Sequence, residues 1–223
     1  MAIKINKLIR SRRRSISIEI TRAGQLVVRM PRYGSVEAVK RFIAEKRDWI
    51  EKKLVEANES ARKNAPRKFV PGEQFYYLGE KYPLRLVEVH HPKLKFQNGF
   101  FIAESNLKYG RKIFIDWYKR QAKLNIPKRV RWYANIYHLN CRQIRITSAS
   151  RRWGSCTTQG NINFTWKLIL LPLKIVDYVV VHELAHLVHH NHSKIFWAEV
   201  GKMLPDYKER RRWLKKNGEE YFI

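Results

Sequence analysis

Apolar and polar residues alternate in two short runs near the N-terminus, at residues 15–20 and 25–30. In the first run isoleucine occupies every second position, so these side chains would lie on one side of an extended chain. Alternation with a period of two residues is typical of a half-buried strand. Ala23 and Gly24 lie between the two runs, and the pattern therefore predicts a β-hairpin.

A helical pattern and three further strand patterns complete the first hundred residues. Ser35 is a candidate helix N-cap, and apolar residues at helical spacing continue from it to about Ala61. Turn-forming residues then separate three short apolar runs that predict strands, at residues 74–78, 84–89 and 100–103. Residues 1–104 are therefore predicted to be strand-rich with one long helix.

The second half of the chain is predicted to be mainly helical. Apolar spacing predicts four helices, at residues 110–138, 173–190, 194–203 and 207–216. Pro127 marks a kink or a new first turn within the first of these helices. Alternation at residues 143–147 and 161–171 predicts two strands between the first and second helices.

Length, hydropathy and cysteine content limit the class of protein. The 223 residues, 44% of them hydrophobic, can supply the core of one large domain or two small ones. The longest apolar runs are far shorter than the roughly 20 residues that a membrane-spanning helix needs. Cys141 and Cys156 form no CxxC pair, which excludes a cysteine zinc cluster. Because charges interrupt the N-terminal apolar residues, no secretory signal is predicted and a cytoplasmic location is expected.

The balance of charge indicates a class of partner. A formal net charge of +27 predicts attraction to polyanions that weakens as salt rises. Nucleic acid is therefore a candidate partner, with a charged surface that only aids solubility as the alternative. The cluster Arg151, Arg152 and Trp153 is a candidate contact with substrate or nucleic acid, with a packed loop as the alternative.

The sequence HELAH at residues 182–186 matches the HExxH pattern, in which two histidines bind zinc and the glutamate is a general base. An α-helix turns about 100° per residue, so His182 and His186 would lie only about 40° apart around the axis. Glu183 would lie about 100° from His182, beside the pair rather than within it. The pattern predicts Zn²⁺ bound by the two histidines, with Glu183 as the catalytic base.

A catalytic zinc normally has three protein ligands and one open position, so a third ligand is needed. On a continuous helix, His189 and His190 would lie about a turn too far along the axis. His192 would lie on the opposite side of that helix, unless the helix ends near Asn191 and the chain turns back. We predict that it does so and that His192 is the third ligand. Glu199 in the following helix remains the alternative.

The segment HELAHLVHHNHSKIFW, together with the upstream RRWGSC and NINFTWKLILLP, resembles the YgjP-like metallopeptidase family, which is related to the SprT-like zinc peptidases. The motifs cover the C-terminal half, and the start SRRRSISIEI is also similar to full-length members. The resemblance implies that His182, His186 and His192 hold zinc and that Glu183 is catalytic.

Patterns and resemblance together predict an α+β chain in two parts. Residues 1–104 would form the strand-rich part, and residues 105–223 a zincin-like metallopeptidase domain with a buried HExxH helix beside a small sheet. The alternative is that the whole chain behaves as one unit.

The predicted reaction is hydrolysis, in which zinc acidifies its bound water, Glu183 takes the proton and the hydroxide attacks a carbonyl. The resemblance implies that the carbonyl belongs to a peptide or protein substrate. Residues 161–167 are predicted to form an edge strand that holds this substrate in extended form. Two alternatives are a nucleic-acid-associated protein with a structural or vestigial zinc site, and a hydrolase of non-peptide bonds. The glutamate of the motif favours the peptidase, because a structural site needs no base.

Overall fold

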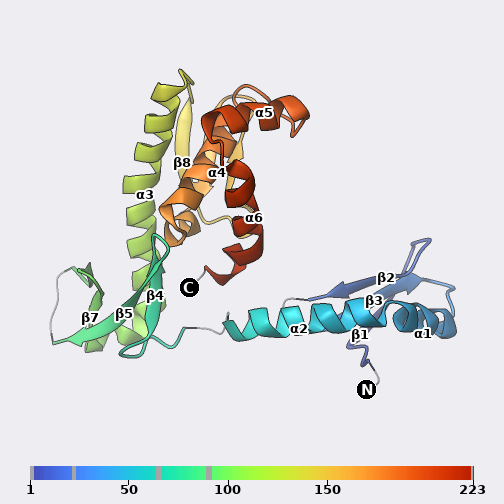
Figure 1. Ribbon diagram of the computed structural model, residues 1–223. Coiled ribbons are helices and arrows are strands. Elements are labelled where there is room, and N and C mark those ends of the chain that lie inside the picture. The colour runs from blue at the N-terminus through green and yellow to red at the C-terminus, as the bar shows by residue number, and fades with distance from the viewer. Residues whose placement is uncertain (1–2, 22–23, 64–66, 89–91, 222) are drawn as a thin grey trace. The chain divides into compact units, whose positions relative to one another are not determined.

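The computed structural model describes residues 3–21, 24–63, 67–88, 92–221 and 223. Contacts divide the chain into two compact units, Met1–Ala65 and Pro66–Ile223. Each unit has its own hydrophobic core and combines helices with a sheet or sheets, which confirms the predicted α+β class (Figure 1). Among the helices of the described ranges, none is both long enough and apolar enough to cross a bilayer.

The first unit is a three-stranded sheet with two helices. Its elements are β1 (Lys7–Ser11), β2 (Ser17–Ile20), β3 (Leu26–Pro31), α1 (Val36–Glu45) and α2 (Arg47–Lys63). The central strand β3 pairs antiparallel with β2, which confirms the predicted hairpin, and Ile20 lies opposite Leu26. Ala23 of the predicted turn lies outside the described residues. Strand β1 pairs parallel with β3 and was not predicted, because charged residues interrupt its apolar pattern.

The single long helix predicted in this region is wrong, because two helices occupy it. The predicted cap is confirmed, since Ser35 Oγ accepts the backbone N–H of Ala38 at 3.1 Å. The break falls within residues 45–48, which are all charged and exposed. Ile43 before the break and Ile50 after it both enter the core. Each helix therefore packs its own apolar side, while no apolar contact holds the segment between them.

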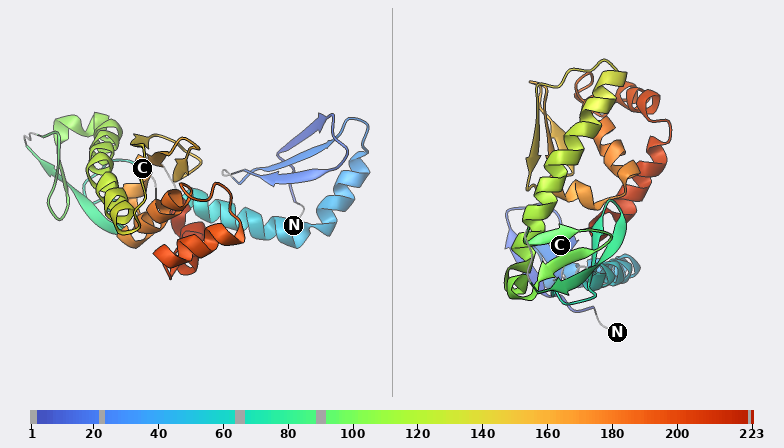
Figure 2. Two further views of the ribbon diagram at one scale, coloured as in Figure 1. Left: turned by 90° about the horizontal axis from the view of Figure 1, so that it is seen from above. Right: turned by 90° about the vertical axis from the view of Figure 1, so that its left-hand side faces the viewer.

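The described residues of the second unit form two sheets and four α-helices. Its strands are β4 (Gln74–Tyr77), β5 (Glu80–Val87), β6 (Leu94–Phe96), β7 (Phe100–Ala103), β8 (Gln143–Thr147), β9 (Gly154–Cys156) and β10 (Asn161–Thr165). Its helices are α3 (Gly110–Ile136), α4 (Leu173–Ala185), α5 (Lys194–Met203) and α6 (Tyr207–Asn217). The sheet orders are β4-β5-β7-β6 and β8-β10-β9. Helix α3 extends from the first of these sheets to the second (Figures 1 and 2).

Aromatic packing joins the first of these sheets to α3. The rings of Phe75 and Phe114 stack with centroids 4.2 Å apart, and the Tyr118 hydroxyl donates to the carbonyl of Tyr76 at 2.6 Å. Pro127 lies inside α3 without ending it. The contacts thus group residues 66–104 with the C-terminal helices, whereas the sequence suggested a division after residue 104. The predicted division into domains that fold independently stays a prediction.

Two contacts fix α4 in the core of the second unit. Arg129 on α3 donates two hydrogen bonds to the Asp177 carboxylate, at 2.7 and 2.8 Å, and Asp177 is only 7% exposed. Such a two-bond pair is stronger and more directional than a single contact. Before α4, the chain is tied to the turn between β4 and β5, where the Gly79 N–H donates to the carbonyl of Leu170 at 2.9 Å. The helix that carries the HExxH motif is therefore held at its start and along its length.

The turn at Gly79 requires glycine for two reasons. Its φ of +92° lies in the region that disfavours side chains, and a Cβ atom would lie 2.7 Å from Cα of Pro172. We expect Gly79→Ala to lower the free energy of unfolding by about 3 kcal/mol, from backbone strain and overpacking together. Urea unfolding followed by near-UV circular dichroism measures the change.

Gly72→Ala is the matched control for this prediction. Gly72 has a similar φ of +82°, but a Cβ atom there would meet nothing within 4 Å. Only backbone strain remains, so the expected loss is about 1 kcal/mol. Equal losses in the two variants would show that the contact with Pro172 does not matter.

Candidate metal centre

Three histidines converge at the end of α4. His182, His186 and His192 each offer a ring nitrogen, and these atoms lie within 4.8 Å of one another. The Nε2 atoms of His182 and His192 are 3.1 Å apart. Two nitrogens bound tetrahedrally at about 2.0–2.1 Å from one zinc ion would be roughly 3.3 Å apart, so the spacing fits a shared ion. The structure thus brings together all three histidines that the sequence suggested.

The convergence depends on an early helix end. Helix α4 ends at Ala185 with His186 as its C-cap, so the predicted stop near residue 190 is wrong. Asn191 is not among the described residues with positive φ, so it does not end a helix in the left-handed conformation. Its side-chain oxygen accepts the Ser193 N–H at 3.2 Å. Ser193 in turn caps α5, since its Oγ accepts the backbone N–H of Phe196. His192 therefore lies on a short, hydrogen-bonded turn that leads the chain back across the end of α4.

The ring of His186 is oriented by the backbone. Its Nδ1 lies 2.9 Å from the carbonyl oxygen of His189. A carbonyl oxygen can only accept, so Nδ1 carries the hydrogen and Nε2 keeps its lone pair. This is the usual way in which a protein sets the tautomer of a metal-binding histidine. The His189 ring is not part of the cluster. Its backbone carbonyl instead orients the ring of His186.

His182 is held as a neutral imidazole. Burial lowers its pKa to about 3, and the neighbouring His186 and His192 add to the effect. Its Nδ1 is buried and has no hydrogen-bond partner within the described part of the chain. A neutral ring with an available lone pair is the form that binds a metal.

Glu183 is a buried residue of α4 that directly follows His182 in the sequence. It is 5% exposed, and no hydrogen bond or ion pair of its carboxylate occurs among the described residues. Burial raises the pKa of Glu183 to about 8, and the positive charge of Arg152 opposes this shift. An uncompensated buried carboxylate is costly for stability, and such groups are concentrated at functional sites.

Gly154 on β9 makes room for this carboxylate. A Cβ atom at Gly154 would lie 2.6 Å from Oε1 of Glu183. The contact places the three-residue strand β9 directly against the acid. Sequence reasoning singled out Arg151, Arg152 and Trp153 but missed Gly154, although the RRWGSC motif contains it. No local pattern could have shown that this glycine faces α4.

An aromatic and cationic stack lies beside His192, which is itself exposed. The Trp197 ring is stacked on His192 with centroids 5.7 Å apart, and on Tyr207 with centroids 5.5 Å apart. The guanidinium of Arg211 lies 4.3 Å from the centroid of Trp197. Trp197 is therefore a packing residue. The sequence did not indicate Tyr207 and Arg211, because no local pattern shows which residues α6 packs against.

Other candidates from the sequence lie outside the cluster. Glu199 pairs with Lys202 at 3.1 Å and is not part of the histidine group. Trp153 packs against the main core, and its carbonyl accepts the Thr165 N–H at 2.9 Å, which favours the packed-loop alternative for this residue. Cys141 and Cys156 are free thiols, and burial raises the pKa of Cys156 to about 11.

Comparison with known proteins identifies the class. A model of the YgjP-like metallopeptidase domain matches residues 14–217. The match makes the protein a metal-dependent peptidase at the level of the family. The chain belongs to the YgjP-like metallopeptidase family, and the resemblance noted in its sequence is confirmed.

One solved structure similar to the chain is the crystal structure of the metallopeptidase zymogen of Pyrococcus abyssi abylysin. The identity is 26%, over 41% of this chain and 93% of that one, with a TM-score of 0.37. None of the curated proteins compared with the chain matches it.

Replacing Gly154 tests the contact with Glu183. We expect Gly154→Ala to push the carboxylate aside and reduce kcat for a peptide substrate by about 100-fold, because a displacement of about 1 Å can cost that much. Metal content should not change, since the histidines are untouched. Steady-state cleavage and metal analysis of the same preparation check both points.

Gly160→Ala, in the turn between β9 and β10, provides the control. Unlike Gly154, Gly160 has positive φ, at +78°, but its nearest neighbours are 3.7 Å from a Cβ atom and do not include Glu183. This variant should lose some stability and keep its kcat. Full activity in Gly154→Ala would contradict the proposed contact.

Proposed function

We propose that the chain is a zinc peptidase in which His182, His186 and His192 hold the ion and Glu183 acts as general base. The observation that carries the proposal is the set of three ring nitrogens within 4.8 Å, with the buried Glu183 on the same helix as His182. Three imidazoles suit zinc, and three protein ligands leave the fourth position open for chemistry.

The surroundings of α4 support a zincin-like arrangement. The helix is buried along most of its length, and the sheet β8-β10-β9 belongs to the same compact unit. Strand β9 lies against α4 through Gly154 and Glu183. A buried helix beside a small sheet is the arrangement that the resemblance implied.

Glu183 is suited to accept and return a proton. Zinc, when bound, supplies a Lewis acid that lowers the pKa of water and polarises a carbonyl. The raised pKa of Glu183, about 8, means that its carboxylate binds a proton more strongly than an exposed glutamate does. The carboxylate can take a proton from water and then deliver it to the departing amine. Arg152 limits the rise in pKa, so part of the carboxylate population stays ionised near neutrality.

The substrate strand must differ from the one predicted. The prediction that residues 161–167 form an edge strand is wrong, because β10 lies between β8 and β9. We assign this role to β9, which pairs only with β10 among the described strands. An extended peptide that adds to its other edge would pass Gly154 and the carboxylate of Glu183.

A structural zinc site is the less favoured alternative. Such a site needs no base, whereas here Glu183 is buried without a described hydrogen-bond partner on the helix that carries His182. Binding of nucleic acid stays a prediction from the net charge of +27. A cytoplasmic location likewise stays a prediction from the N-terminal sequence.

The third ligand can be tested by metal affinity. We expect His192→Ala to weaken zinc binding by more than about 100-fold, since loss of an outer-shell partner alone costs about 10- to 100-fold. Glu199→Gln should bind zinc like the parent, because Glu199 pairs with Lys202 outside the cluster. Competition with a chromophoric chelator measures both. The reverse pattern would assign the ligand to Glu199.

The base can be tested separately from the metal. We expect Glu183→Gln to retain zinc and to lose about 10²- to 10⁴-fold in kcat, the usual contribution of a general base. Cleavage of a peptide library, with chelated and zinc-restored parent enzyme as controls, measures the loss. A variant that cleaves as well as the parent would falsify this role for Glu183.

A further inference from the structure

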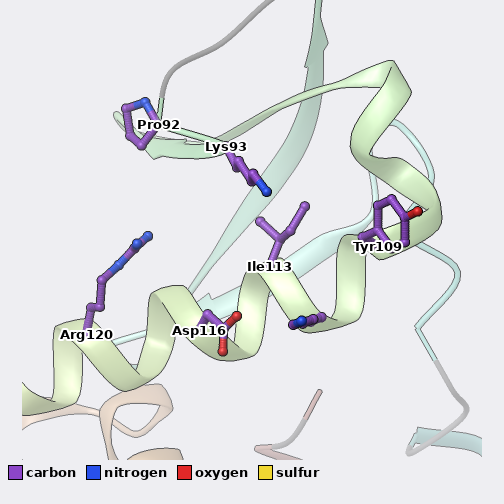
Figure 3. Close-up of a pocket in the computed structure, with 7 residues that line it drawn as sticks. Pro92, Lys93, Tyr109, Ile113, Asp116 and Arg120 are labelled. Atoms are coloured by element: carbon purple, nitrogen blue, oxygen red, sulfur yellow. The ribbon is translucent and has the colours of Figure 1, made fainter.

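A pocket lies on α3, and none of the residues of the proposed metal centre line it. This pocket, of about 520 Å³, opens between one face of the N-terminal half of α3 and the chain that leads into β6 (Figure 3). Volumes of about 300–1,000 Å³ are typical of ligand sites. Lys112 and Arg120 on α3 and Lys93 across the opening contribute positive charges, and Asp116 lies between the two α3 cations in sequence. We call this pocket the basic groove.

The charged side chains of the basic groove are available to a ligand. Within the described residues, no hydrogen bond or ion pair engages the side chains of Lys93, Lys112, Asp116 or Arg120, and all four are exposed. The i, i+4 spacing would allow Asp116 to pair with Arg120 on the helix surface. In Figure 3, however, Arg120 points away from Asp116 and toward the Pro92 and Lys93 side of the opening.

The mixture of groups indicates the class of ligand. Three cations against one carboxylate favour an acidic ligand. Asp116 would repel a phosphate placed between the cations, but its oxygens can accept backbone N–H groups. Ile113, which is 9% exposed, offers an apolar floor for a side chain. A polypeptide supplies carboxylates, backbone donors and apolar side chains together, whereas a nucleic acid carries a phosphate at every nucleotide.

We propose that the basic groove is an exosite that binds an acidic segment of the polypeptide substrate, a role that rests on the proposed peptidase function. Arg129, which contacts Asp177 on α4, follows Asp116 by 13 residues on the same helix. A rise of 1.5 Å per residue makes this roughly 20 Å. About six extended residues at ~3.3 Å each cover such a length. This length reaches only Arg129 and Asp177, and Glu183 follows Asp177 by six residues on α4. The acidic stretch would therefore lie at least about six residues from the bond that is cleaved.

The test measures binding rather than cleavage. The full-length Glu183→Gln protein, which does not process its ligand, is titrated with a fluorescein-labelled peptide of six glutamates around a central leucine. In this background, Lys112→Glu with Arg120→Glu should weaken peptide binding about tenfold or more, because two attractions become repulsions. Circular dichroism confirms that the variant is folded.

A charge-matched control separates the groove from the basic surface. Lys123→Glu with Lys128→Glu makes the same change in net charge at exposed positions of α3 outside the groove. This control should weaken binding about twofold or less at 150 mM salt, where distant charges are screened. Equal weakening in the two double variants would overturn the proposal, because binding would then reflect net charge alone.

Two further outcomes decide the class of ligand and the link to catalysis. If a thymidine oligonucleotide of equal charge depends on the groove while the peptide does not, the occupant is nucleic acid and the proposal is overturned. In an otherwise parental enzyme, the groove variant should cleave a short neutral peptide normally. If the tests at Glu183 and His192 fail, the proposed peptidase function is overturned. The peptide-binding measurement would still show whether the groove binds an acidic peptide.

Discussion

The early end of α4 is the constraint on which the proposed centre depends. His182 and His186 lie on one side of the helix because of their spacing, but His192 would lie on the far side of a longer helix. The chain stops being helical at His186 and returns through a turn fixed by Asn191 and Ser193. The carbonyl of His189 accepts a hydrogen bond from the His186 ring within the same turn. The end of α4 and the turn that follows it thus bring the His192 ring to the other two histidines and orient the His186 ring.

Burial of α4 gives the site both its rigidity and its proton chemistry. The Arg129 and Asp177 pair fixes the helix to α3, so the histidines project from an anchored element. The same burial keeps His182 neutral and raises the pKa of Glu183. Low polarity favours uncharged imidazoles, which bind metal, and a carboxylate with increased affinity for protons. The packing that stabilises the fold is therefore also what prepares the chemistry.

Charge is distributed unevenly between the proposed centre and its surroundings. The proposed centre consists of three histidines and the buried Glu183, whereas cations without a partner among the described residues line the groove on α3. Exposed cations act over a distance and suit capture of an acidic chain, while the reaction needs short, directional contacts. A single helix, α3, links the two, since it carries the groove on its first half and contacts α4 through Arg129 on its second.

Much of the local structure and most of the metal centre follow from the sequence. The β2-β3 hairpin and the caps at Ser35 and Ser193 depend on neighbouring residues, as does the pairing of His182 with His186, so local patterns are sufficient to predict them. Helix geometry disfavours His189 and His190 as the third ligand, and the family resemblance favours His192 over Glu199, although the helix ends earlier than predicted.

Tertiary structure decided the features that involve residues far apart in the chain. Alternation in residues 161–165 shows that a strand is half-buried, but not that β10 has a neighbour on each side. The RRWGSC motif does not show that Glu183 lies against its glycine. The sequence of α6 likewise does not show that one of its arginines lies over the ring of Trp197. Periodicity reports how a segment is buried, while the identity of its neighbours depends on packing that only the folded chain establishes.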